Sequence, residues 1–275
     1  MTIWRLLQDG AAPGAWNMAV DEALLLSYTA SPTLRFYSWQ PACVSLGRFQ
    51  RLRTADCGLR IGDEPDAALS LNPQSAITNP QCFDLVRRPT GGRAVLHQHE
   101  ITYAVVIGEQ LLPAGARSVI GAYRWLSAGF IAGLRGLGVE ARLARSDLAA
   151  PQRSTNCFAS AAQCDFVVDD RKLIGAAQCR KHGVILQHGS LLIDMDEAAW
   201  KATVGGSMTD AVTLKSLGVT AGTGQIITAL CAGVEGVLDV SLQAGTLNDA
   251  ESALAHRLRC EKYSGRTWNQ DGIPS

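Results

Sequence analysis

The alternation of strand-like and helix-like segments limits what this chain can fold into more than any other feature of its sequence. Residues 17–29 and 118–138 carry apolar residues at helical spacing, and Asn17 suits the N-cap of the first helix. Strand-like runs cover 33–39, 42–49, 83–88, 94–107 and 164–195, the last holding two or three strands joined by turns at 169–171 and 181–183. The pattern contains no repeat and no long linker, so it predicts one main domain of mixed helices and strands.

The pattern weakens in two places. Residues 54–80 mix Gly, Asp, Pro, Asn and Ser without periodicity, which is typical of an exposed insertion. After Asp196 only helical pieces remain. We therefore expect a main domain over residues 1–200 and a small helical C-terminal extension, residues 201–275, packed on it.

The composition excludes several classes of partner. Of 275 residues, 47% are hydrophobic, which is enough for a sizeable core, and 25 Lys and Arg balance 25 Asp and Glu. This balance gives no reason to expect nucleic acid or an anionic membrane surface as a partner. The N-terminal segment is interrupted by charges where a secretory signal would need an apolar run, and no window resembles a membrane span. The expected compartment is the cytoplasm.

The eight cysteines are scattered along the chain, without a CxxC pair or a histidine at zinc-finger spacing. We therefore expect no metal site, and we expect most of the cysteines to be free thiols buried as small apolar residues. They are Cys43, Cys57, Cys82, Cys157, Cys164, Cys179, Cys231 and Cys260.

The stretch RRPTGGRAVLH, which begins at Arg87, combines two arginines with a Thr-Gly-Gly turn. Adjacent glycines allow positive φ angles and a close backbone approach to a ligand, and arginines add charge and forked donors. This chemistry suits a phosphate or a carbonyl group. The alternative is a hairpin whose glycines only make the turn, with His97 as a structural histidine whose ring nitrogens are already hydrogen bonded.

A second group of residues suggests a nucleophile. Cys157 lies in a loop near the apolar Phe158, and Lys172 begins a strand after the turn 169–171. If the chain folds back on itself, the two side chains meet, and an ammonium beside a thiol favours the thiolate needed for acyl transfer. The alternative is that Lys172 is an ordinary solvated lysine in a turn.

These motifs, together with DRKLIGAAQ and GVILQHGSLLIDMD, resemble the lipoate–protein ligase and octanoyltransferase family, which is related to biotin protein ligases. The resemblance spans about residues 4–196. It implies an α+β fold, in which helices flank a mixed, largely antiparallel sheet of the biotin/lipoate ligase, class II synthetase-like type. Arg93 stands where ATP-dependent ligases usually have a third glycine, and Cys157 occupies the loop position of the octanoyltransferase nucleophile. Both features favour the octanoyltransferase branch.

The resemblance also implies roles for individual residues. Cys157 would form an acyl thioester, and Lys172 would lower the pKa of its thiol. The residues expected to bind substrate are Arg87, Arg88, Thr90, Gly91, Gly92, Arg93, Val95, His97 and Gly175. Leu96 and the strand 184–186 would add to an apolar tunnel for the eight-carbon chain. No metal, nucleotide or other cofactor is expected.

The donor implied by the resemblance is octanoyl-acyl carrier protein, and the acceptor is a lysine of the glycine-cleavage H protein or another lipoyl domain. Two alternatives remain open. An ATP-dependent lipoate–protein ligase would use the same glycine turn and lysine but would not need Cys157. A catalytically silent acyl-binding protein of this fold would need neither Cys157 nor Lys172.

Overall fold

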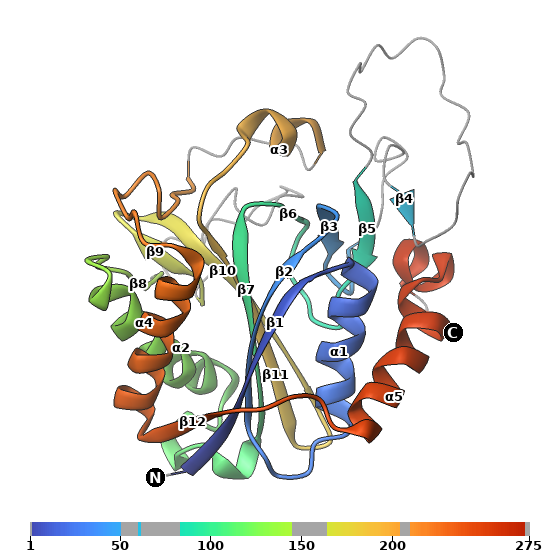
Figure 1. Cartoon of the computed structure of the whole chain (residues 1–275), viewed down its shortest axis with the longest axis horizontal. Coiled ribbons are helices and arrows are strands. Elements are labelled where there is room, and N and C mark those ends of the chain that lie inside the picture. Colours follow the sequence, from blue (N-terminus) through green and yellow to red (C-terminus); the bar gives the residue numbers. More distant parts are fainter. Residues whose placement is uncertain (1, 51–59, 62–82, 145–163, 204–209, 273–275) are drawn as a thin grey trace.

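The structure of the protein is a computed structural model that describes residues 2–50, 60–61, 83–144, 164–203 and 210–272. An eight-stranded sheet runs through its centre in the order β12-β1-β2-β7-β11-β10-β9-β8 (Figure 1). Its strands are β1 (Thr2–Ala12), β2 (Thr33–Trp39), β7 (Glu100–Gly108), β8 (Arg142–Leu143), β9 (Phe166–Val168), β10 (Arg171–Lys181), β11 (Val184–Leu192) and β12 (Val240–Ala244). The pairs from β2 to β8 are antiparallel, and only β12-β1-β2 is parallel.

A smaller sheet of the order β4-β5-β3-β6 lies beside the main one. It consists of β3 (Cys43–Leu46), β4 (Arg60–Ile61), β5 (Asp84–Arg87) and β6 (Val95–His97). Strand β3 pairs parallel with β5 and antiparallel with β6. Because β5 continues directly into the Thr-Gly-Gly turn, this small sheet holds the turn against the main sheet.

Helices cover both faces of the main sheet, so the expected α+β fold is confirmed (Figure 1). Helices α2 (Val119–Gly136) and α4 (Thr223–Leu238) bury one apolar cluster, which includes Phe130 and Leu230. Helices α1 (Gly14–Leu26) and α5 (Asp249–Leu258), with two π-helical turns at 259–263 and 267–271, bury the other, which includes Met18 and Trp268. The short helix α3 (Glu197–Thr203) follows β11.

Two expectations about the elements need correction. Helix α1 begins at Gly14 after Pro13, so Asn17 lies inside it and not at its N-cap. Its amide instead donates to the carbonyls of Ala12 and Ser38, tying the helix to the sheet. The stretch 94–107 is not one strand, because β6 and β7 belong to different sheets.

The chain changes sheets at Gln98 and His99, where the His99 carbonyl accepts the N–H groups of Ile193 and Asp194. The other expected elements are confirmed. Helix α2 starts at the Ser118 cap, whose hydroxyl accepts the Gly121 N–H. Both expected turns of the stretch 164–195 have left-handed backbone, at Asp169–Asp170 and His182–Gly183.

The C-terminal part of the chain is mostly helical, but β12 pairs with β1 in the main sheet. The division near residue 200 stays a prediction. Most of the expected insertion 54–80 lies outside the described residues, which include only β4 from it. Among the helices of the described part, none is long and apolar enough to span a membrane.

Candidate active site

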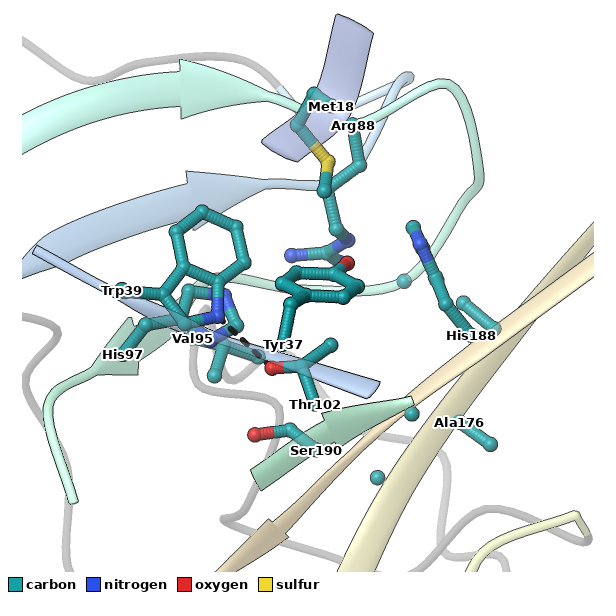
Figure 2. Close-up of a pocket in the computed structure, with 14 residues that line it drawn as sticks. Met18, Tyr37, Trp39, Arg88, Val95, His97, Thr102, Ala176, His188 and Ser190 are labelled. Atoms are coloured by element: carbon teal, nitrogen blue, oxygen red, sulfur yellow. Dashed lines mark hydrogen bonds between the residues drawn. The ribbon is translucent and has the colours of Figure 1, made fainter. Parts of the chain in front are cut away.

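A cavity lies between the main sheet, the small sheet and helix α1 (Figure 2). Its walls are largely apolar, and polar groups converge on it from several elements, as in many small-molecule sites. The lining residues are Met18, Tyr37, Trp39, Arg88, Gly92, Val95, His97, Thr102, Gly175, Ala176, Ala177, His188, Gly189 and Ser190.

The floor of the cavity is a stretch of small residues on β10. Gly175, Ala176 and Ala177 pair with Ser190, Gly189 and His188 of β11. The missing or short side chains at Gly175 and Ala177 leave room on the cavity side. Gly189 serves the opposite face of the sheet, because a Cβ there would lie 2.5 Å from the Tyr103 ring.

The Thr-Gly-Gly turn forms the roof of the cavity, and Arg88 holds it in shape. The Arg88 guanidinium donates to the carbonyls of Ser45 (2.8 Å), Gly91 (3.1 Å) and Arg93 (2.9 Å) and to the Ser45 hydroxyl (2.6 Å). Gly92 has φ = +95°, a conformation that residues with side chains rarely adopt. The turn therefore needs glycine at this position, and Arg88 is buried beneath it.

His97 lines the cavity and is also a fully hydrogen-bonded histidine. Its Nε2 is hydrogen bonded to Ser45 Oγ and its Nδ1 to the Glu100 carboxylate. Trp39 stacks on the ring at 3.8 Å between centroids, and its indole N–H donates to Thr102 Oγ1. The functional and structural interpretations of His97 are thus compatible, since its orientation is set by neighbours on both sides.

A buried network of charged and polar groups, here called the charged wall, closes another side of the cavity. It consists of Arg35, Asp21, Tyr37, His188 and Thr90. Asp21 accepts from the Arg35 guanidinium (2.7 Å) and the Tyr37 hydroxyl (2.8 Å), and contacts His188 Nδ1 (3.0 Å). Thr90 Oγ1 lies 2.6 Å from His188 Nε2. Thr90 therefore acts on the cavity through His188 and is not itself a lining residue.

The wall sets the protonation of its members. Burial lowers the pKa of His188, and the hydrogen bond and charge of Asp21 offset only part of this lowering. Burial alone would raise the pKa of Asp21, but the hydrogen bond from His188 and the charge of Arg35 hold it below its usual value. Sequence reasoning missed Asp21, Arg35 and His188. Their signal was an ionisable residue inside an otherwise apolar helix or strand, which indicates a buried and paired group.

Lys172 is buried, so its interpretation as a solvated turn lysine is wrong. Its ammonium lies 2.7 Å from Asp165 Oδ2. A β-bulge between Lys172 and Ile174 changes the direction of the strand at this point. The Lys172 main chain is bound on its other side by the Asp210 carbonyl and the Val212 N–H. Cys157 lies outside the described residues, so its distance from Lys172 is not described.

Arg87 is an expected site residue whose side chain the structure directs away from the cavity. Because successive residues of a strand point to opposite faces, Arg87 and Arg88 diverge. The Arg87 guanidinium donates to the carbonyls of Gly47 (2.9 Å), Arg48 (3.2 Å), Gln50 (2.6 Å), Trp268 (2.9 Å) and Gln270 (2.8 Å). It therefore joins the loop 47–50 to the C-terminal segment and has no contact with the cavity.

The remaining expected residues divide into two groups. Gly92, Val95, His97 and Gly175 line the cavity together with Arg88. Gly91 and Arg93 contribute carbonyls to Arg88 and do not line it. Leu96 and the strand 184–186, which we expected in an apolar tunnel, belong to the core clusters of the small and main sheets. Met18 and Trp39 supply apolar walls instead.

Within the described ranges, no three His, Cys, Asp or Glu side chains come together as a possible metal site. The described cysteines are free thiols, and burial raises the pKa of most of them. Cys179 and Cys231 have thiol pKa values of about 11, and the pKa of Cys43 lies well above the ordinary value. These thiols are therefore poor nucleophiles near neutral pH.

Comparisons with known proteins place this geometry in a family. The Lipoyl protein ligase A/B catalytic domain matches residues 13–230. Curated proteins named Octanoyltransferase LipM are similar over 70% of this chain or more. That of Kyrpidia tusciae is 39% identical, covering 98% of this chain and 99% of the relative. That of Bacillus subtilis is 40% identical, covering 70% of this chain and 66% of the relative.

Solved structures agree with the fold. The structure of protein Ta0514 from T. acidophilum with bound lipoic acid has a TM-score of 0.77 at 23% identity, covering 98% of this chain and 99% of that one. Lipoate-protein ligase A bound with ATP has a TM-score of 0.76 at 25% identity, covering 99% of this chain and 100% of that one. The resemblance inferred from the motifs is thus confirmed: the chain belongs to the lipoyl protein ligase A/B catalytic domain family.

Proposed function

We propose that this protein transfers an octanoyl group from octanoyl-acyl carrier protein to a lysine of a lipoyl-domain acceptor, with Cys157 as the covalent carrier. The observation that supports this most is its similarity to octanoyltransferases at 36–39% identity over 98% of the chain. The largely apolar cavity, with the buried Lys172 three residues along β10 from its floor at Gly175, adds support from the structure.

The first half-reaction loads the enzyme. The Cys157 thiolate attacks the thioester carbon of the donor, a new C–S bond forms, and the donor's own C–S bond breaks. The departing carrier thiolate takes a proton from solvent. The octanoyl chain then extends along the small residues of β10 toward Met18 and Trp39, which are apolar and line the cavity.

The second half-reaction transfers the acyl group to the acceptor. The neutral amine of the acceptor lysine attacks the Cys157 thioester, an amide bond forms, and Cys157 leaves as the thiolate. The nitrogen gives its extra proton to solvent. The acceptor is a lipoyl domain, and we propose the glycine-cleavage H protein as the first one to test.

Lys172 acts as a fixed cation in both half-reactions. Its ammonium is paired with Asp165 at 2.7 Å, and both side chains are almost completely buried. A charge held in this way stabilises the thiolate and the developing oxyanion without having to reorganise. Gly92 lets the turn approach the acyl group, while Arg88, Val95, His97 and Gly175 shape the cavity around it.

An ATP-dependent lipoate–protein ligase is the second candidate, because the chain also resembles lipoate-protein ligase A bound with ATP. In that reaction the activated carboxyl group would be an adenylate, so Cys157 would not be required. The two reactions therefore differ in their need for one side chain and one nucleotide.

Acylation of H protein by the wild type and by Cys157→Ser and Lys172→Ala decides between them. We expect the wild type to use octanoyl-acyl carrier protein without ATP and to gain one octanoyl mass that hydroxylamine removes. Cys157→Ser should form no such adduct, and Lys172→Ala should load about a hundredfold more slowly. ATP-dependent activity that survives Cys157→Ser would instead establish the ligase, and no activity with either donor would indicate a silent acyl-binding protein.

A further inference from the structure

The polar side chains that line the cavity are nearly all committed to other protein groups. Tyr37 donates to Asp21, and both ring nitrogens of His188 have partners. Both ring nitrogens of His97 are also occupied. Thr102 accepts from Trp39 and donates to Glu100 (2.8 Å each).

Ser190 is the exception. It is only 4% exposed, lines the cavity, and its Oγ has no hydrogen-bond partner in the part of the chain that the structure describes. Figure 2 shows it beside Thr102 among the lining side chains. A buried hydroxyl without a partner is uncommon and costs stability, so its presence in a binding cavity indicates a group reserved for a ligand.

The register of the sheet places Ser190 at the end of the cavity closest to Lys172. Of the three lining pairs between β10 and β11, Gly175 with Ser190 is the one nearest to Lys172 along β10. At about 3.3 Å per residue, Lys172 lies roughly 10 Å from Gly175 along the strand. On its other side Ser190 pairs with Thr102 of β7. The reacting end of the acyl group belongs near Lys172, so Ser190 lies closer to it than His188 does.

We propose that the Ser190 hydroxyl donates a hydrogen bond to the carbonyl oxygen of the octanoyl group while that group is bound to Cys157. The same bond strengthens when the carbonyl becomes the oxyanion of each tetrahedral intermediate. Ser190 keeps its proton throughout and is not a nucleophile, because neither neighbouring histidine has a free ring nitrogen to act as its base. This role rests on the proposed function, since it requires an acyl thioester in the cavity.

The test compares Ser190→Ala with a matched control, Ser127→Ala. Ser127 in α2 is also a buried serine whose hydroxyl has no partner among the described residues, but it does not line the cavity. Both changes remove a hydroxyl on which no described side chain depends, so both variants should fold. We expect Ser190→Ala to lower the rate constant of loading from octanoyl-acyl carrier protein about a hundredfold with little change in KM. Ser127→Ala should load like the wild type.

Infrared spectroscopy of the acyl-enzyme carrying a ¹³C-labelled carbonyl gives a second reading. In the wild type the carbonyl band should lie below that of an octanoyl thioester in an apolar solvent, because a hydrogen bond weakens the C=O bond. In Ser190→Ala it should move to higher frequency. Equal loading rates and an unmoved band in Ser190→Ala would overturn the role of Ser190. A wild type that forms no Cys157 thioester at all would overturn the proposed function instead.

Discussion

Two buried arginines, Arg35 and Arg87, are held in different ways. Arg35 belongs to the charged wall, where Asp21 and Asp9 lie 2.7 and 2.6 Å from its guanidinium. Arg87 is the centre of what we call the carbonyl clamp, which consists of Arg87, the loop 47–50 and residues 268–270. In the clamp, every acceptor that the structure gives for the Arg87 guanidinium is a main-chain carbonyl.

The two environments affect the arginines in opposite directions. Burial lowers the pKa of Arg87, and the nearby charge of Asp271 offsets only part of this effect. Burial also acts to lower the pKa of Arg35, but the carboxylates of Asp21 and Asp9 outweigh it and raise the pKa. The wall therefore depends on paired charges and on pH. The clamp depends on the main-chain geometry of two segments that are far apart in the sequence.

The largest effect is expected when the pairing of the wall is broken. Asp21→Asn removes the carboxylate between Arg35 and His188, leaving a buried charge with poorer compensation. We expect the free energy of unfolding to fall by about 3–5 kcal/mol, measured by urea denaturation. Asp194→Asn is the control, because Asp194 forms an exposed pair with Lys215. An equal and small effect of both changes would mean that the wall is not stabilised by charge pairing.

Replacing the arginine of the clamp should lower the free energy of unfolding less than Asp21→Asn does. Arg87→Met keeps the apolar stem but removes every donor, so several carbonyls lose a partner, some of which water can replace. We expect a loss of about 2–4 kcal/mol in the same assay. Arg135→Met, at an exposed pair with Glu140, should change little. A loss larger than that of Asp21→Asn would contradict the difference between carboxylate and carbonyl environments.

Acid should weaken the charged wall but not the carbonyl clamp. The folded pKa of His188 lies below its unfolded value near 6.5. The contribution of neutral His188 to the stability of the fold is therefore complete above that pH. It is lost as the pH falls toward the folded pKa, because the unfolded chain then binds the proton more readily. Asp21 adds a further loss below its unfolded value near 3.8, because its folded pKa is lower still.

Between about pH 6.5 and 5, His188 can add at most one proton, or roughly 1.4 kcal/mol per pH unit, to the slope of stability against pH. His188→Gln should flatten this slope, whereas Arg87→Met should keep it. The measurement is the unfolding free energy of each variant across this range. A wild-type slope that survives in His188→Gln would show that other groups carry the acid sensitivity.

The smallest effect concerns one hydrogen bond of the clamp region. The Trp268 indole N–H donates to the Arg87 carbonyl at 2.9 Å. Trp268→Phe removes that donor and part of the ring, and should cost about 1–2 kcal/mol in urea denaturation. Trp125→Phe is a control, because Trp125 packs only partly buried against the core. If Trp268→Phe costs nothing, the clamp does not depend on this bond.

The local patterns of the sequence determined much of this protein. Apolar periodicity predicted α2, and turn residues predicted the hairpins at 169–171 and 181–183. The positive φ of Gly92 followed from its place after Thr90 and Gly91, because glycine alone readily takes that conformation. The motif residues also predicted the family, although the roles of Cys157 and Lys172 stay proposals.

Other features depended on contacts between distant segments. Strand alternation makes Arg87 and Arg88 diverge, but only the placement of residues 268–270 beside the loop 47–50 decides that Arg87 is the one that points away from the cavity. Likewise, Asp21 and His188 are 167 residues apart and become partners only when α1 packs on β11. A short sequence pattern predicts which face of its own helix or strand a side chain occupies. The partner on that face is supplied by the tertiary fold, and burial then makes an unpaired charge too costly to tolerate.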